Sequence, residues 1–180
     1  IYPTLIEDQI KYILNNSESK LIFIEDMNQY KRILITGGAG FIGRETTKKL
    51  LSAGYEVTCF DLAEQHMRHS AMLKEIGKIG KLHLKFGSIL DRNALREAMS
   101  DIDVVFHLAA MLGVKKTEEQ KLGCIEVNIT GTDNIFNAAV AHSVQKVIFA
   151  SSSEVYGEPI KNPISEEQPT QGKTVYGVTK

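Results

Sequence analysis

Apolar and polar positions follow two alternating periods along most of the chain. Short apolar runs, typical of buried strands, are separated by stretches in which apolar residues recur every three or four positions, as on one face of a helix. Strands are predicted at Arg32–Thr36, Glu56–Phe60, Leu82–Phe86, Asp103–Leu108 and Lys146–Ala150. Helices are predicted between them at Phe41–Ala53, Ala63–Lys78, Asp91–Met99 and Thr117–His142.

This order of elements predicts the class of fold. Strands that alternate with helices imply right-handed crossovers and a parallel sheet covered on both faces, so we expect a doubly wound α/β domain. Asp91 is a good N-cap for its helix. In the longest predicted helix, apolar residues recur at helical spacing, which predicts an amphipathic helix; they are Leu122, Ile125, Ile129, Ile135, Phe136 and Ala139.

Composition narrows the classes of function. Of the 180 residues, 43% are apolar and 24% are charged, as in a soluble globular protein. The formal net charge of −1 argues against nucleic acid or an anionic membrane as partner and favours small molecules. The sequence shows neither a signal peptide nor an apolar run of the ~18 residues that a membrane span needs, so we expect a cytoplasmic protein.

The cysteines and histidines show no spacing typical of metal ligands. Cys59 and Cys124 lie inside apolar patterns and are interpreted as buried free thiols. The histidines are interpreted as surface or structural residues; they include His66, His69, His83 and His142. We therefore expect no metal site.

A glycine-rich turn between the first strand and the first helix is the strongest single motif. It reads Ile33-Leu34-Ile35-Thr36-Gly37-Gly38-Ala39-Gly40-Phe41-Ile42-Gly43. Glycine is needed where the chain turns tightly, where the backbone approaches a pyrophosphate and where a helix packs closely on a strand, while the free N–H groups of the helix face the phosphates. The residues expected at a dinucleotide are Gly37, Gly40, Phe41, Ile42 and Gly43.

Asp61, at the end of the next strand, extends this motif. It lies at roughly the ~20-residue separation at which a carboxylate can accept hydrogen bonds from both ribose hydroxyls of an adenosine. A carboxylate would also repel a 2′-phosphate, and no arginine follows Asp61 immediately. The sequence therefore favours NAD over NADP as cofactor of a Rossmann-type domain.

Six ordered motifs resemble those of the extended short-chain dehydrogenases, the NAD-dependent epimerase/dehydratase family. They are the TGxxGxxG turn Thr36–Gly43, Gly87-Ser88-Ile89, His107-Leu108-Ala109-Ala110, Asn128-Ile129-Thr130-Gly131-Thr132-Asp133-Asn134, Ser151-Ser152-Ser153-Glu154-Val155-Tyr156-Gly157, and Tyr176-Gly177-Val178-Thr179-Lys180. The resemblance implies that Ser88 and Ile89 hold the adenine, although an aspartate is usual at Ser88. It also implies that Leu108, Ala109 and Ala110 lie against the dinucleotide.

The last two motifs carry the reactive groups. Tyr176 and Lys180 are four residues apart, so on a helix they share one face, and an ammonium there would lower the pKa of the phenol. Tyr176 could then take the proton of a sugar hydroxyl while Lys180 also binds the nicotinamide ribose. Alignment on Val155–Gly157 assigns Ser152 to the same substrate oxygen.

Glu154 bears on the type of reaction. A carboxylate beside a 4-keto sugar can process it further. The pair Ser153-Glu154 resembles sugar-nucleotide decarboxylases and GDP-mannose-type dehydratases, whereas glucose-type 4,6-dehydratases tend to show Asp-Glu. Simple 4-epimerases often lack the carboxylate, yet some members carry it without an elimination step. Epimerase, dehydratase and decarboxylase all stay open.

Two interpretations of function follow. In the first, the complete protein modifies a nucleotide-linked sugar with NAD, and a homodimer is possible. In the second, the 180-residue chain is a non-catalytic NAD-binding fragment or scaffold, because the resemblance implies further strands and a substrate lobe after Lys180. The strand Lys146–Ala150 would then be an exposed edge.

The first 26 residues differ in character from the rest. Thr4-Leu5-Ile6-Glu7 is a capping box that opens a predicted helix, and a strand is predicted at Leu21–Glu25. The segment resembles an internal piece of AMP-forming long-chain acyl-CoA ligases, but the Ser/Thr/Gly nucleotide loop of that family is missing, which excludes ligase activity. We expect an extension of different origin over 1–26, joined to an NAD-binding domain over 27–180; an ordinary N-terminal extension is the alternative.

Overall fold

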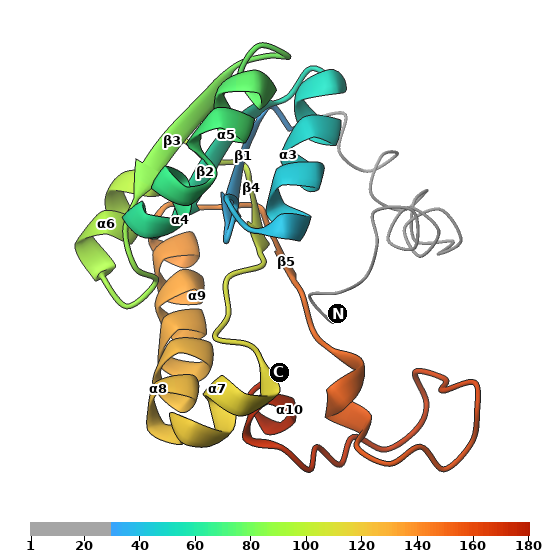
Figure 1. Cartoon of the computed structure of the whole chain (residues 1–180). Helices are drawn as coiled ribbons and strands as arrows, with labels where there is room; N and C mark the ends of the chain where they lie inside the picture. The colour runs from blue at the N-terminus through green and yellow to red at the C-terminus, as the bar shows by residue number, and fades with distance from the viewer. Residues whose placement is uncertain (1–29) are drawn as a thin grey trace. The chain divides into compact units, whose positions relative to one another are not determined.

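A five-stranded parallel sheet forms the centre of the domain. The computed structural model describes residues 30–180, so the predictions for residues 1–26 lie outside the described part. The strands are β1 (Arg32–Thr36), β2 (Glu56–Asp61), β3 (Leu82–Phe86), β4 (Val104–His107) and β5 (Lys146–Phe149). Their order across the sheet is β3-β2-β1-β4-β5, with all neighbours parallel (Figure 1). The predicted doubly wound α/β fold is confirmed.

Alternate residues of β1 enter two different cores. Leu34 joins a cluster with Phe60 and Val105 that packs against residues of helices α6 (Arg92–Ala98) and α9 (Gly131–Ala141). Ile33 and Ile35 point to the opposite face, as the period of two in a strand requires, and are also fully buried. Helix α3 (Phe41–Ser52) packs on β1 and β2 and lies beside α5 (Ser70–Ile76) (Figure 1). Each face of the sheet is therefore covered.

Most predicted helix boundaries agree with the structure to within one or two residues. Helix α6 begins after Asp91, whose side chain accepts hydrogen bonds from the backbone N–H groups of Asn93 and Ala94, so the predicted N-cap is confirmed. The stretch predicted as one helix at Ala63–Lys78 forms two, α4 (Ala63–Arg68) and α5 (Ser70–Ile76), because the backbone of His69 leaves the helical region between them.

The single helix predicted at Thr117–His142 is wrong. The chain forms α7 (Val114–Glu119), α8 (Lys121–Ile125), the π-helical segment η2 (Glu126–Thr130) and α9. The non-helical φ and ψ of Gln120 separate α7 from α8. A π-helix rotates the residues on either side of it relative to one another. The apolar residues that recur at helical spacing in this stretch consequently do not lie on one buried face.

Polar residues take part of the buried face of these helices. Of the six apolar residues used for the prediction, only Ile135 and Ala139 are buried; Leu122 is 83% exposed. Asn128 and Asn134 are buried in their place. A buried amide is stable only with hydrogen-bond partners, and both have them, as described below.

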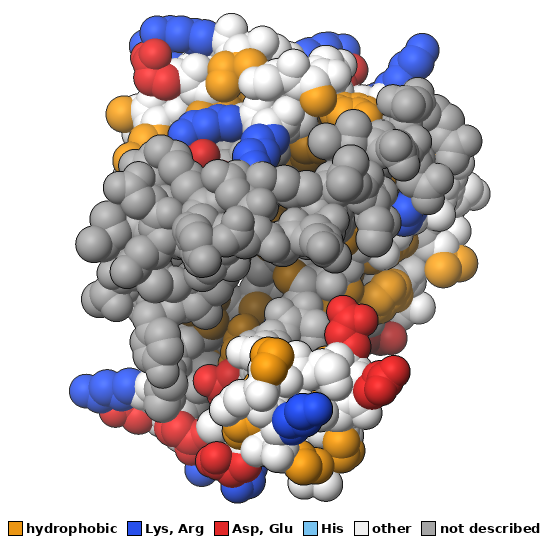
Figure 2. All heavy atoms as spheres, turned by 90° about the vertical axis from the view of Figure 1, so that its right-hand side faces the viewer, with side chains coloured by type: hydrophobic (Ala, Val, Ile, Leu, Met, Phe, Trp, Pro, Cys, Tyr) orange, Lys and Arg blue, Asp and Glu red, His pale blue; other side chains and the backbone are white. Residues whose placement is uncertain are grey.

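Three expectations from the sequence can be compared with the structure of residues 30–180: the edge strand, the balance of charge and the lack of a membrane-spanning helix. Strand β5 lies at the edge of the sheet, as predicted for Lys146–Ala150. Basic and acidic side chains both occur on the face drawn in Figure 2, in line with the net charge of −1. No helix within residues 30–180 is long and apolar enough to cross a membrane.

Leu34→Ala tests the core between the sheet and helices α6 and α9. Leu34 is fully buried, so we expect the free energy of unfolding to fall by about 2 to 5 kcal/mol. Urea unfolding measures the change. Met67→Ala, at a position that is 68% exposed on α4, is the control and should change stability by less than about 0.5 kcal/mol. Equal effects of the two substitutions would contradict this packing.

Candidate active site

The glycine turn after β1 brings three backbone segments into close contact. Gly37 has φ +70°, and a Cβ added to it would lie 2.8 Å from the backbone nitrogen of Ala109, after β4. A Cβ on Gly43 would lie 2.2 Å from the carbonyl oxygen of Gly37. Only glycine allows these approaches, which press α3 and the end of β4 against the turn.

The turn presents the first N–H groups of α3 to an anion. The N-cap is Gly40, and no side chain in the described residues caps this helix. Phe41 and Ile42 follow it with exposed side chains. Uncapped N–H groups at the positive end of a helix dipole are suited to a pyrophosphate. The residues present therefore fit the phosphates of a dinucleotide.

Asp61 lies beside this turn, at the end of β2. One carboxylate oxygen accepts a hydrogen bond from the Ala39 N–H at 3.0 Å, and the other accepts one from the Leu62 N–H at 2.8 Å. The guanidinium of Arg44 donates to the Ala39 carbonyl at 2.6 Å. Asp61 is half-buried, and each carboxylate oxygen keeps acceptor capacity for a ribose hydroxyl.

The loop after β3 is held by α9. The Asn134 side chain donates to the carbonyl oxygen of Ile89 at 3.2 Å and accepts from Arg92 Nε at 2.9 Å. A Cβ on Gly131 would lie 2.5 Å from Ile89 Cδ1, so the glycine makes room for this side chain. Ser88 Oγ accepts a hydrogen bond from the Leu90 N–H, as a turn serine does. Both residues expected at an adenine thus lie in one anchored loop.

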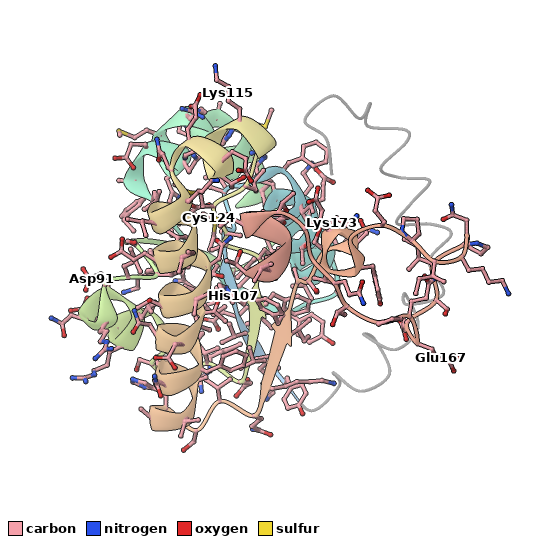
Figure 3. All side chains as sticks on the ribbon, turned by 90° about the horizontal axis from the view of Figure 1, so that it is seen from below. Asp91, His107, Lys115, Cys124, Glu167 and Lys173 are labelled. Atoms are coloured by element: carbon pink, nitrogen blue, oxygen red, sulfur yellow. The ribbon has the colours of Figure 1, made fainter. Side chains whose placement is uncertain are left out.

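His107 joins β1, β4 and α9 through a directed chain of hydrogen bonds. The Thr132 hydroxyl donates to the carbonyl oxygen of Asn128 at 2.6 Å, so it accepts from His107 Nε2, at 2.9 Å. Nδ1 of the neutral ring therefore accepts from the Thr36 hydroxyl, at 2.7 Å. Burial, and then the charge of Lys180, lowers the pKa of His107 to about 4. Figure 3 labels His107 and Cys124.

Asn128, in η2, connects two further segments. Its side-chain oxygen Oδ1 accepts from the Met111 N–H at 2.7 Å, and its side-chain Nδ2 donates to the Met111 carbonyl oxygen at 3.1 Å. The same amide donates to the hydroxyl of Thr179 at 3.0 Å. Asn128 thereby fixes the segment after β4 and the helix α10 (Val175–Val178) relative to each other. Sequence reasoning matched this asparagine to a motif but gave it no role.

Three residues of the predicted reactive set converge near the end of β5. The Ser152 hydroxyl lies close enough to the Tyr176 phenol to lower the pKa of the phenol. The Lys180 ammonium lies 4.4 Å from the centre of the Phe149 ring. A cavity of about 460 Å³ adjoins Ser152 and is lined by Ser151, Ser152, Ser153, Val155, Tyr156, Ile164 and Glu166. A substrate hydroxyl could reach Ser152 from this cavity.

The expected lowering of the Tyr176 pKa by Lys180 is wrong for the chain described. Burial raises the pKa of Tyr176, the hydrogen bond to Ser152 lowers it, and the carboxylate of Glu154 raises it further. Lys180 does not contribute, because α10 ends at Val178 and the ammonium lies over Phe149 instead. Burial also lowers the pKa of Lys180.

The cysteines and the acidic residues near the site form no metal centre. Cys59 and Cys124 are buried free thiols, as predicted. Burial raises the pKa of Cys59 to about 12. Among residues 30–180, no group of three His, Cys, Asp or Glu side chains could hold a metal ion.

The fold and this constellation define a dinucleotide-binding domain of the short-chain dehydrogenase class. The model of the NAD dependent epimerase/dehydratase family matches residues 33–180. The chain belongs to this family, whose members are NAD-dependent enzymes.

Curated relatives carry several activities. A UDP-N-acetyl-alpha-D-glucosaminuronate decarboxylase of Bacillus cytotoxicus is 44% identical over 149 residues, which are 83% of this chain and 43% of the relative. A UDP-glucose 4-epimerase of Bacillus subtilis is 37% identical over 152 residues, which are 82% of this chain and 44% of the relative. The chain thus spans less than half the length of these relatives.

Solved structures agree with the fold. A UDP-glucose-4-epimerase from Stenotrophomonas maltophila, with bound NAD and formylated UDP-arabinopyranose, has a TM-score of 0.77 at 31% identity. The similarity covers 84% of this chain and 46% of that one. The enzyme from Bifidobacterium longum, in complex with NAD+ and UDP, has a TM-score of 0.75 at 31% identity, over 83% of this chain and 46% of that one.

The ring of His107 should stay neutral to unusually low pH. We expect long-range ¹H–¹⁵N NMR to show the Nε2–H tautomer and a titration near 4, well below the ~6.5 of an unfolded chain. Because the folded pKa lies below the unfolded one, this residue stabilises the fold fully above ~6.5, and the contribution is lost as pH falls towards 4. The resonance is assigned by its loss in His107→Gln, and titration near ~6.5 would contradict the network.

Proposed function

We propose that the whole protein is an NAD-dependent enzyme that oxidises C4 of a nucleotide-linked sugar and processes the 4-keto product further. The observation that carries the proposal is the convergence of Ser152 and Tyr176 beside a cavity, in the same domain as a glycine turn that fits a pyrophosphate. Membership of the NAD-dependent family supports it. The formylated UDP-arabinopyranose in one similar solved structure and the UDP in another support the class of substrate.

NAD, when bound, supplies the hydride acceptor. The glycine turn and the N-terminus of α3 would hold its pyrophosphate, and Asp61 would accept hydrogen bonds from the adenosine ribose. The loop of Ser88 and Ile89 would hold the adenine, and Leu108, Ala109 and Ala110 would lie along the dinucleotide. Asp61 supports NAD rather than NADP because a carboxylate repels a 2′-phosphate.

The chain's own residues would hold the substrate oxygen and move its proton. Ser152 would donate a hydrogen bond to the sugar hydroxyl, and Tyr176 would accept the hydroxyl proton. Burial raises the pKa of Tyr176, so the phenol becomes a base near neutral pH only when positive charge approaches it. Lys180, four residues after Tyr176, would supply this charge once its ammonium turns from the Phe149 ring.

Among the three reactions, decarboxylation has the most support. Ser153-Glu154 resembles the decarboxylase pattern, and the relative of 44% identity is a decarboxylase of a UDP-linked hexuronate. The 4-epimerase of 37% identity keeps epimerisation as the second candidate. The exposed Leu122, Ile129 and Val140 on α8, η2 and α9 support a homodimer.

Binding of NAD by the 180-residue chain is tested by thermal unfolding. We expect NAD to raise the melting temperature, by an amount equivalent to about 2.7 kcal/mol at a hundredfold excess over Kd, and NADP to have a smaller effect. Asp61→Asn should weaken the response to NAD. Asp101→Asn, at an exposed aspartate paired with Arg32, is the control. An unchanged response in Asp61→Asn would exclude the ribose contact.

Turnover by the whole protein tests the reactive group. Tyr176→Phe removes only the phenolic oxygen, so NAD binding should persist while turnover of the sugar nucleotide falls at least about a hundredfold. Tyr55→Phe, at a half-buried tyrosine between α3 and β2, is the matched control and should keep its activity. Full activity of Tyr176→Phe would favour the alternative, an NAD-binding scaffold.

A further inference from the structure

Two short helices are joined by hydrogen bonds that pass through one threonine hydroxyl. Thr174 is the N-cap of α10, and its Oγ1 accepts from the Gly177 N–H at 2.9 Å. The same hydroxyl donates to Oε2 of Glu154 at 3.0 Å. Glu154 lies in the 3-10 helix η3 (Ser153–Tyr156). A hydroxyl has one proton and two lone pairs, so both bonds form together and each strengthens the other.

The backbones of the two helices also meet at this point. A Cβ added to Gly177 would lie 2.6 Å from the carbonyl oxygen of Glu154. No larger residue fits here without movement of one backbone, so α10 lies directly against η3. The hydrogen bonds of Thr174 therefore act across a contact that leaves little room for adjustment.

A second connection links the same two segments through the reactive groups. The Ser152 hydroxyl accepts from the Glu154 N–H at 3.3 Å, which caps η3, and it also interacts with the phenol of Tyr176 in α10. The segment of Ser152 and Glu154 is thus linked to α10 at two points, through Thr174 and through Tyr176. Loss of the Thr174 hydroxyl would leave the interaction of Ser152 with Tyr176 as the side-chain link between them.

We propose that Glu154 is a positioning residue whose carboxylate, acting through the Thr174 hydroxyl, fixes α10 and so keeps the Tyr176 phenol beside Ser152. The inference rests on the proposed function only for the identity of Tyr176 as the reacting group. It differs from direct attack of Glu154 on the sugar, because the Thr174 hydroxyl already uses one carboxylate oxygen. The Glu154 charge also raises the pKa of Tyr176.

Hydrogen exchange of the Gly177 amide reports on this contact without cofactor or substrate. Measured by NMR on the 180-residue chain, the exchange rate should rise at least about fivefold in Glu154→Ala and in Thr174→Val, since an N-cap is lost or loosened. Thr174→Ser and Glu154→Gln keep the donor and the acceptor, so their rates should stay within about twofold of wild type. Glu158→Ala, which removes a neighbouring carboxylate paired with Lys173, is the control.

The tyrosinate absorbance separates the charge of Glu154 from its hydrogen bond. After subtraction of the Tyr176→Phe titration, Glu154→Gln should lower the pKa of Tyr176, because it removes the nearby negative charge, while Gly177 exchange stays protected. An unchanged Gly177 exchange rate in Thr174→Val would overturn the proposal. So would a Glu154→Gln chain as unprotected as Glu154→Ala.

Turnover by the whole protein distinguishes positioning from chemistry. Positioning predicts that turnover falls at least about tenfold in Thr174→Val and that Thr174→Ser, which keeps the hydroxyl, stays within about threefold of wild type. A Glu154→Gln enzyme as inactive as Glu154→Ala, with an active Thr174→Val, would instead assign Glu154 to the reaction. A protein without turnover would refute the proposed function but leave the exchange and absorbance results able to decide on this contact.

Discussion

The buried hydrogen bonds of one helical region, η2 and α9, hold the parts of the site in place. Thr132 reaches β1 and β4 through His107, Asn134 holds the loop after β3, and Asn128 joins the segment after β4 to α10. Each of these segments carries residues expected at the cofactor or the substrate. A buried polar network that is fully satisfied specifies one arrangement, and one that loses a member leaves unpaired groups. The mutual placement of the loops therefore depends on these polar side chains.

The donor-to-acceptor direction of the hydrogen bonds in this network follows from the chemistry of its members. The backbone carbonyl oxygen of Asn128 can only accept a hydrogen bond, so the Thr132 hydroxyl must donate to it. This in turn orients the imidazole of His107 and the hydroxyl of Thr36. A protonated imidazole would have no acceptor to offer Thr36. Burial, and then the charge of Lys180, lowers the pKa of His107, and the order of donors likewise requires a neutral ring.

The strands and the glycine turn could be predicted from sequence because each is encoded locally. Apolar runs bounded by glycine fixed the strand positions to within two residues, and Asp61 lies beside the turn as its spacing implies. The breaks in the long predicted helix could not be predicted from sequence, since the break at Gln120 and the π-helical segment depend on tertiary contacts. The structural roles of Asn128 and Asn134 were missed because buried amides resemble surface residues in a sequence; their recurrence with Gly131 and Thr132 in one motif was the available signal. The direction of the Tyr176 pKa shift required knowledge of the burial of the phenol and of its neighbours Ser152 and Glu154.

The π-helical segment Glu126–Thr130 constrains the number of residues in this helical region. Each residue of an α-helix advances the chain by about 100° around its axis. The wider turn at η2 absorbs this angle, so Cys124 and Asn128 face α10 while Ile135 and Ala139 face the core. Loss of one residue from η2 would make the helix regular and rotate its first half away from α10. The outer face of this region can vary widely in composition, whereas its length can hardly vary at all.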